Sequence, residues 1–151
     1  MSELPIIDVS GLRSARLVDR QAVGRALGEA SRGVGFFYVV GHDLGGDRIR
    51  DAFSASHRFF AQDMAAKQAL SIKRSAHDRG YIALEDEQLD PTSPADYKEA
   101  FNVGLELAED HPEVLAGIPF RGPNFWPDLP GWREQILDFY NRAWSTGVLI
   151  H

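Results

Sequence analysis

The length and composition of the chain indicate one globular domain. Its 151 residues are 44% hydrophobic and 25% charged, which is enough for a real core and too short for two ordinary domains. Sixteen Lys and Arg against 22 Asp and Glu give a net charge of −6, which argues against nucleic acid or an anionic membrane as a partner. No apolar run approaches the roughly 20 residues of a membrane-spanning helix, so we expect no integral membrane protein.

The absence of cysteine from all 151 residues excludes disulfides, zinc–thiolate sites and iron–sulfur clusters from this chain. The first residues, Met1–Pro5, have neither the basic region nor the apolar stretch of a secretory signal. Together these features predict a cytoplasmic protein in a reducing compartment.

The N-terminal part of the chain predicts a strand, a helix and a second strand. Leu4–Val9 is typical of a short edge strand, because its proline lies at the start. Apolar residues recur at helical spacing from Ala15 to Arg32, and Gly33 is expected to end this helix in the left-handed conformation. Gly35–Val40 has no polar alternation, so we expect a strand that needs cover on both faces, of which this helix supplies only one.

The next segment predicts two helices. Asp47 is a good N-cap residue, and the helix that follows it is expected to end near Gln62. Asp63 can cap a further short helix that runs through Lys67. The face of the longer helix that we expect to be buried carries Ile49, Phe53, Ser56 and Phe60.

The C-terminal half predicts a loop, a strand and a long helix. Leu84–Ala95 contains four acidic residues and two prolines, which is typical of an exposed loop. Tyr97–Leu107 is a candidate strand, and Gly117–Gly131 is rich in proline, glycine and aromatic residues. A helix is expected from Gly131 to the end, with a broad buried face formed by Ile136, Tyr140, Ala143, Trp144 and Val148.

Four motifs occur in the order typical of one enzyme family. They are Pro5-Ile6-Ile7-Asp8, the run Gly35–His42, Arg79-Gly80-Tyr81, and Asn124-Phe125-Trp126-Pro127. Together they resemble the N-terminal region of the isopenicillin N synthase-like oxygenases, which depend on Fe(II) and usually on 2-oxoglutarate. Asp96–Phe101 is similar to the acidic-Lys-Glu-x-Phe segment of that family. Gly41-His42-Asp43 departs from it, since the family more often has Asn-His-Gly there.

The resemblance implies an α+β fold, in which helices pack on a few strands. In the intact enzyme these strands would extend a double-stranded β-helix, or jelly roll, that is absent here. Residues 1–151 would then be the N-terminal non-haem dioxygenase domain of a longer chain. The whole enzyme would use Fe(II), 2-oxoglutarate and O₂ to hydroxylate, desaturate or cyclise a small organic substrate. Its partners would be that substrate and the missing C-terminal catalytic core, with self-association through uncovered apolar faces as a further option.

The same resemblance places the iron ligands outside this chain. The family holds iron with a His-x-Asp motif and a distant His on the jelly roll, and binds 2-oxoglutarate with an Arg-x-Ser pair. The sequence contains no Arg-x-Ser triplet. We therefore expect no catalytic and no metal-ligating residue within residues 1–151, and an inactive segment.

The resemblance maps three residues to the rim of the active site as substrate-binding candidates. Arg79 would suit a substrate carboxylate through its two-pronged guanidinium, and Tyr81 offers a flat apolar face with a polar tip. Glu87 lies in an acidic run that could select a cationic substrate. The alternatives are a solvated charge for Arg79, a half-buried aromatic for Tyr81 and a solvated face for the acidic run.

Two motifs favour structural use over catalysis. A carboxylate in the segment Asp96–Phe101 could pair with a nearby Lys or Arg, and the Asn-x-Trp-Pro motif could fix a turn that docks the last helix. Two other functions stay open. One is a non-catalytic interaction or scaffold domain, and the other is an unrelated metalloenzyme using His111, Glu113 and His151, although Pro112 favours a turn between the first two.

Overall fold

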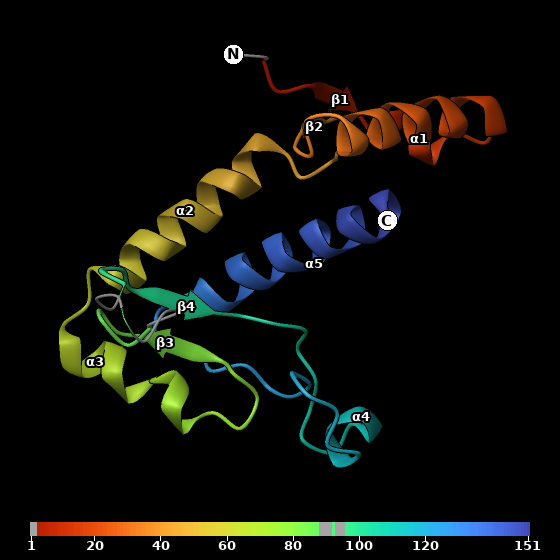
Figure 1. Cartoon of the computed structure of the whole chain (residues 1–151). Coiled ribbons are helices and arrows are strands. Elements are labelled where there is room, and N and C mark those ends of the chain that lie inside the picture. Colours follow the sequence, from red (N-terminus) through yellow and green to blue (C-terminus); the bar gives the residue numbers. More distant parts are fainter. Residues whose placement is uncertain (1–2, 88–91, 93–95) are drawn as a thin grey trace. The chain divides into compact units, whose positions relative to one another are not determined.

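A computed structural model describes residues 3–87, 92 and 96–151, and these form a mixture of helices and short strands (Figure 1). The chain divides into two compact units, each described by itself below. Unit 1 comprises Met1–Arg50 and Asp138–His151, and unit 2 comprises Asp51–Leu137. The interpretation of residues 1–151 as a single domain stays a prediction.

Unit 1 is built on two parallel strands joined by a helical crossover. Strand β1 (Ile6–Asp8) pairs with β2 (Tyr38–Val40), with Ile6 opposite Tyr38 and Asp8 opposite Val40. The 3-10 turn η1 (Ser10–Arg13) and helix α1 (Leu17–Arg32) lie between them in the chain. Parallel strands require such a crossover because the chain must return to the starting end of the first strand before the second strand begins, which a tight turn cannot do.

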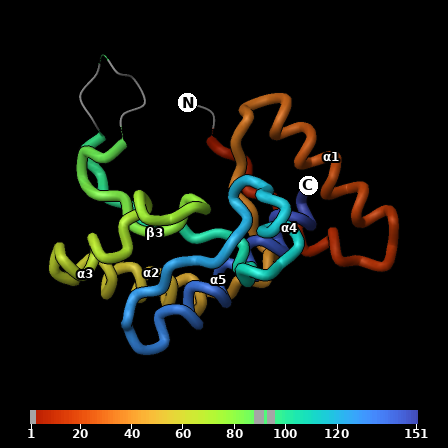
Figure 2. The backbone as a smooth tube through the Cα atoms, turned by 90° about the horizontal axis from the view of Figure 1, so that it is seen from below, coloured from red at the N-terminus to blue at the C-terminus, as the bar shows by residue number. Residues whose placement is uncertain are grey.

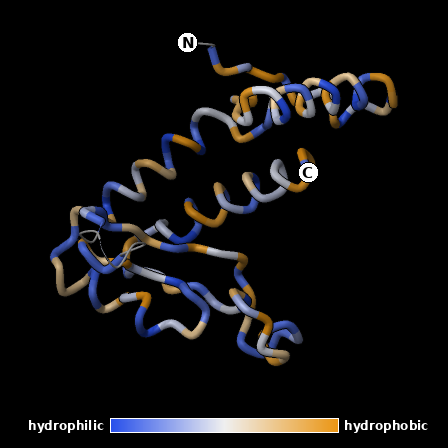
Figure 3. The backbone as a smooth tube through the Cα atoms, in the orientation of Figure 1, coloured by the Kyte–Doolittle hydropathy of each residue, from blue (hydrophilic) through white to orange (hydrophobic). Residues whose placement is uncertain are grey.

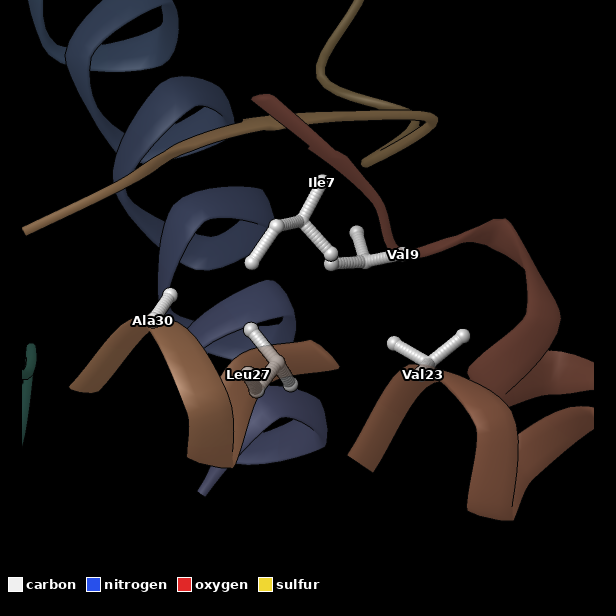
Figure 4. Packing of buried hydrophobic residues seen from close by; sticks show 5 residues of the cluster. All are labelled: Ile7, Val9, Val23, Leu27 and Ala30. Carbon is white, nitrogen blue, oxygen red and sulfur yellow. The ribbon is translucent and has the colours of Figure 1, made fainter. Parts of the chain in front are cut away.

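The core of unit 1 lies between this strand pair and α1. Figure 4 shows Ile7 and Val9 above three residues of α1, namely Val23, Leu27 and Ala30, and all five are buried. Phe37 and Val39 of the second strand segment, and Ile150 near the end of the chain, pack against this cluster. One face of the sheet is therefore covered by α1.

The opposite face of the same strand pair is exposed. Phe36 and Tyr38 are 72% and 62% exposed, and Ile6 and Val40 are also exposed. The strand is shorter than the expected Gly35–Val40, and α1 covers only one of its faces, as expected. The residues of this exposed surface are Ile6, Phe36, Tyr38 and Val40.

The expected left-handed cap at Gly33 is wrong. Gly33 ends α1 with φ −86°, and the positive φ of 82° occurs two residues later, at Gly35. The Gly35 amide donates to the carbonyl of Ala30 at 2.9 Å, while the Gly33 amide donates to Glu29 at 2.9 Å. These two hydrogen bonds satisfy carbonyls in the last turn of α1, before the chain turns toward β2.

Unit 2 combines short helices with one antiparallel strand pair (Figures 1 and 2). Strand β3 (Gly80–Ile82) pairs with β4 (Ala100–Asn102), and Tyr81 lies opposite Phe101. Among the residues of unit 2 that the structure describes, the other elements are α3 (Met64–Ala69), η2 (Ile72–Arg74) and α4 (Pro112–Leu115). Two long helices cross the boundary between the units in the chain, α2 (Gly46–Phe60) and α5 (Trp132–Ile150).

Aromatic rings form the core of unit 2. The ring of Phe59 meets the edge of Phe101 at a centroid distance of 4.5 Å, and Phe101 meets Trp132 at 5.3 Å. The Trp132 indole N–H donates to the Ala55 carbonyl at 2.8 Å, so its polar atom is satisfied where the ring is buried. The expected N-cap of α3 is confirmed, because Asp63 Oδ1 accepts the Ala66 amide at 2.8 Å.

The expected buried faces of the two long helices are confirmed only in part. Phe60 and Ile136 pack against the core of unit 2 as expected, but other residues of the expected faces are exposed. Helix α2 buries Ala52, Ala55 and Phe59, whereas Phe53 is 66% exposed. Spacings of three and four residues join the buried three, but two alanines give a weaker apolar signal than the large side chains beside them. Asp47 lies within the first turn of α2 and does not precede it as an N-cap.

The buried face of helix α5 also differs from the expected one. Trp144 and Val148 are exposed, while Thr146 is buried and donates its hydroxyl to the His42 carbonyl at 3.0 Å. Figure 3 shows that hydrophobic residues recur along α5 up to the C-terminal end, so hydropathy alone does not select its buried face. None of the helices in residues 3–87 and 96–151 is long and apolar enough to cross a membrane.

Replacing Phe59 by Ala should destabilise unit 2 by about 3 to 5 kcal/mol, because a fully buried ring would leave a cavity among aromatic neighbours. Urea unfolding of the 151-residue chain, followed by tryptophan fluorescence, measures the change. Phe53→Ala is the matched control on the same helix, and it should change the free energy of unfolding by within about 0.5 kcal/mol. Equal losses in the two variants would contradict the placement of the buried face.

Candidate functional site

The candidate rim residues lie on and around strand β3. Ser75 Oγ accepts the Arg79 amide at 3.0 Å and the His77 amide at 3.1 Å, which shapes the turn that leads into the strand. Gly80 and Tyr81 then pair with β4. We call Lys67, Arg79, Tyr81 and Glu99 the β3 cluster.

Arg79 is buried, with 6% of its surface exposed, and its terminal nitrogens are engaged within the chain. Nη1 donates to the His77 carbonyl at 2.8 Å, and Nη2 donates to the Phe120 carbonyl at 2.7 Å. The Nε atom is buried without a hydrogen-bond partner among the described residues. A solvated charge, the alternative for Arg79, is therefore wrong, and in this arrangement neither Nη atom is free to bind a substrate carboxylate.

The hydrogen bond from Arg79 to Phe120 also holds an unusual backbone conformation at Phe120. Phe120 has a φ of 59°, a left-handed conformation that costs a residue with a side chain roughly 1 to 2 kcal/mol. The carbonyl of this residue accepts the Arg79 Nη2 hydrogen bond. Gly104 lies so close to the guanidinium that a Cβ there would overlap it. Arg79 thus joins three segments that are distant in the sequence.

Tyr81 is also fully buried, at 1% exposed, where a half-buried aromatic was the alternative. Its hydroxyl donates to Glu99 Oε2 at 2.7 Å, and burial together with this carboxylate raises the pKa of Tyr81 to about 12. The Lys67 ammonium donates to the same Glu99 oxygen at 2.8 Å and lies 5.4 Å from the centroid of the Tyr81 ring. The phenol therefore remains a protonated donor over the ordinary pH range.

The pairing expected for the Asp96–Phe101 segment is present. Hydrogen bonds from Lys67 and Tyr81 lower the pKa of Glu99 from its ordinary value of 4.5. Lys67 is the member of the β3 cluster that the sequence did not single out. Its side chain is only 8% exposed. The one sequence signal for this burial is its position three residues after Met64, which places both side chains on the same side of α3.

Glu87 lies in the loop after β3, and its side chain is more exposed to solvent than those of the β3 cluster. Its carboxylate pairs with Lys98 Nζ at 2.5 Å, and its backbone carbonyl accepts the Asp96 amide at 2.8 Å. Asp86 pairs with Lys73 at 2.6 Å, and this hydrogen bond lowers the pKa of Asp86. The expected loop Leu84–Ala95 is described only in part, and Asp90 lies outside the described residues.

The Asn-x-Trp-Pro motif forms a hydrogen-bonded turn around Glu106. Asn124 is buried and exchanges hydrogen bonds with the Gly104 backbone, its Oδ1 accepting at 2.8 Å and its Nδ2 donating at 2.9 Å. The Trp126 indole donates to Glu106 Oε1 at 3.0 Å, and Arg133 at the start of α5 donates to the same oxygen at 3.1 Å. The expected docking of the last helix by this motif is confirmed.

The alternative metal site is not assembled. His111 Nδ1 accepts the Glu113 amide at 3.2 Å and caps α4, and the Glu113 carboxylate pairs with Arg121 at 2.9 Å. Within the described ranges, no three or more His, Cys, Asp or Glu side chains gather in a group that could hold a metal ion. The set of His111, Glu113 and His151 is therefore not supported.

Glu99→Gln should destabilise unit 2 by about 2 to 4 kcal/mol at neutral pH, because it leaves the Lys67 ammonium buried without its counter-ion. The lowered pKa of Glu99 means that its contribution is complete above 4.5 and is lost as pH falls through the folded-state pKa. The difference between wild type and variant should therefore shrink in acid, as urea unfolding across this pH range will measure.

The matched control for this substitution is Glu87→Gln, which removes a more exposed pair with Lys98 and should cost no more than about 1 kcal/mol. A Glu99→Gln variant as stable as this control would show that the buried ion pair does not hold α3 to the strands.

Comparison with known proteins identifies the family. Residues 4–129 match the family model described as non-haem dioxygenase in morphine synthesis N-terminal. The chain is 31% identical over 153 residues to kihadalactone A synthase of Citrus sinensis, covering 99% of this chain and 44% of that protein. It is 32% identical over 147 residues to isopenicillin N synthase of Amycolatopsis lactamdurans, covering 92% of this chain and 42% of that protein.

Solved structures show the same fold. A putative 2OG-Fe(II) oxygenase family protein of Caulobacter crescentus superposes with a TM-score of 0.78 at 22% identity, covering 99% of this chain and 47% of that one. A Neurospora crassa protein, solved in complex with alpha-KG and thymine, gives 0.71 at 21% identity and covers 97% and 47%. The chain thus spans less than half the length of these relatives. Because the family model matches most of its residues, the chain belongs to the family of non-haem dioxygenase N-terminal domains.

Proposed function

We propose that this chain is the N-terminal part of an Fe(II)/2-oxoglutarate-dependent oxygenase that oxidises a small organic molecule with O₂. The family match over residues 4–129 carries the proposal. The names of several relatives agree with it, including the 2-oxoglutarate-dependent dioxygenase eupC of a Phoma species, 36% identical over 150 residues. Whether the product is hydroxylated, desaturated or cyclised depends on residues outside this chain.

The residues present do not fit the metal or the cosubstrate. No metal-holding group of three side chains occurs in the described part of the chain, and the sequence has no Arg-x-Ser triplet. The iron and the 2-oxoglutarate would be held by the rest of the protein, in a jelly-roll core that the two strand pairs described here would extend.

The contribution of this chain would be to shape the substrate side of the site. Arg79 and Tyr81 are buried and bonded within the chain, so they would position the rim and not contact substrate directly in this arrangement. Glu87 is the candidate for direct contact, because its carboxylate is partly exposed in the loop after β3. A carboxylate there would favour a substrate with a positive charge or hydrogen-bond donors.

We also propose a cytoplasmic location. The proposal is supported by the absence of cysteine from all 151 residues, which is typical of proteins with no need for disulfides in a reducing compartment. Fractionation of cells that express the longer protein would test it, and recovery of the protein outside the cytoplasm would contradict it.

The longer protein should convert 2-oxoglutarate to succinate in a reaction that needs both Fe(II) and O₂, whereas the 151-residue chain alone should show none of this turnover. Succinate formation, measured with and without a chelator, is the readout. The matched control is the longer protein with its first His-x-Asp histidine replaced by Ala. Succinate formation that resists both chelator and this replacement would reject the oxygenase assignment, and the absence of any turnover across a broad substrate panel would favour the scaffold alternative.

In the longer protein, Glu87→Gln should raise KM for a cationic substrate by about tenfold, which corresponds to roughly 1.4 kcal/mol for one charged contact. Steady-state kinetics on the preferred substrate measures the change. Glu109→Gln is the control, since Glu109 is an exposed carboxylate in a different loop. Unchanged KM in the Glu87 variant would exclude a direct contact and leave its pair with Lys98 as a structural one.

A further inference from the structure

Met64 carries the only sulfur atom of this chain besides that of Met1, because the 151 residues include two methionines and no cysteine. It is the first residue of helix α3, directly after the Asp63 cap. The residue is 45% exposed, so solvent reaches its side chain. Sulfur is the atom on which two-electron oxidants act in proteins, through cysteine and methionine, and Met64 is therefore the internal target that this chain offers to them.

The same sulfur lies against the polar centre of the β3 cluster. Met64 Sδ is 3.8 Å from the Tyr81 hydroxyl oxygen, and this hydroxyl donates to Glu99 Oε2 at 2.7 Å. A thioether is a weak acceptor, so the carboxylate takes the hydroxyl proton in the unmodified chain. Tyr81 is only 1% exposed. Met64 is thus a side chain through which a reagent in solvent can act on a hydroxyl that solvent does not reach.

Oxidation would reverse the balance between these two acceptors. The sulfoxide is polar, and its oxygen is a much stronger acceptor than the thioether sulfur. A phenol has one proton to donate, so a bond to the sulfoxide is made at the expense of the bond to Glu99. The Lys67 ammonium, which donates to the same Glu99 oxygen at 2.8 Å, would then be left there without the phenol. The contacts that join α3 to the strand pair would be weakened.

We propose that Met64 is a site of modification by hydroperoxides, and that its sulfoxide releases the Tyr81 hydroxyl from Glu99 and loosens unit 2. With hydrogen peroxide, a lone pair of the sulfur attacks one peroxide oxygen, so that an S–O bond forms and the O–O bond breaks. The other oxygen leaves as water, with the proton of the transferred oxygen. The sulfur is oxidised by two electrons and the peroxide is reduced by two. The proposal is independent of the proposed function, because no step uses iron, 2-oxoglutarate or a substrate.

Peptide mass spectrometry tests the reaction itself. The intact protein is treated with hydrogen peroxide, then denatured and digested with trypsin, which releases Phe59–Lys67, a peptide whose one sulfur is that of Met64. This peptide should gain one oxygen atom at a rate within about tenfold of that of the same peptide free in solution, because the side chain is half exposed. Slower oxidation than this would overturn the site.

Native trypsin cleavage after Lys67 tests the effect on the β3 cluster. The Lys67 side chain is 8% exposed, so trypsin cuts there only when the cluster opens, and the initial cleavage rate reports how often it does. Oxidised protein should be cut after Lys67 about tenfold faster than unoxidised protein, as expected when one hydrogen bond to a charged group is lost. Cleavage after Arg16 is the internal control, since this exposed residue of unit 1 should be cut at the same rate in both.

Two variants separate the proposed contact from general damage. Met64→Leu keeps an apolar side chain of similar volume without sulfur, so peroxide should leave its rate of cleavage after Lys67 unchanged. Tyr81→Phe removes the hydroxyl alone, so peroxide should oxidise Met64 there without accelerating cleavage. The proposal is overturned by unchanged cleavage in oxidised wild type, by acceleration in Met64→Leu, or by equal acceleration in Tyr81→Phe and wild type.

Met64→Gln covers the case in which Tyr81→Phe does not fold, as circular dichroism will show. The amide oxygen of Gln is a strong acceptor at the same place, so this variant should be cut after Lys67 faster than Met64→Leu without any peroxide. Equal rates in Met64→Gln and Met64→Leu would show that an acceptor at position 64 does not draw the Tyr81 hydroxyl from Glu99, and would overturn the proposal.

Discussion

The hydrogen bond from the Tyr81 hydroxyl to Glu99 ties unit 2 together. It joins β3 to the segment that leads into β4, and the Lys67 ammonium on the same oxygen adds α3. A buried phenol and ammonium are each costly alone, and the half-buried Glu99 carboxylate satisfies both. The aromatic core of Phe59, Phe101 and Trp132 then packs beside a strand pair whose register this set helps to hold.

Local chemistry was predictable from the sequence wherever the deciding contact lies nearby in the chain. The Asp63 cap depends on an amide three residues away, and Pro112, which the sequence placed in a turn, lies in the first turn of α4 after the His111 cap. The family resemblance was also accessible, because its motifs are short and lie in a fixed order. A carboxylate of the segment Asp96–Phe101 was expected to pair with a basic residue, although neither Glu99 nor its partner Lys67 could be named.

Features set by distant contacts could not be predicted in the same way. Arg79 bonds to a carbonyl 41 residues away, and Lys67 bonds to Glu99 across 32 residues. Nothing near Arg79 in the sequence shows that it is buried, so a solvent-facing role was the natural expectation. The buried side of α2 was misjudged because Ala52 and Ala55 are small, and small residues let neighbouring elements approach closely without a strong hydropathy signal.

The contact between Arg79 and Gly104 has a consequence for how this domain can vary. Because the guanidinium occupies the space that any Cβ at position 104 would need, the two positions are coupled. A side chain at 104 would require the guanidinium to move or a smaller residue at 79, and either change would break the hydrogen bond to the Phe120 carbonyl. A change at position 104 therefore also disturbs the contact that holds the loop around residue 120.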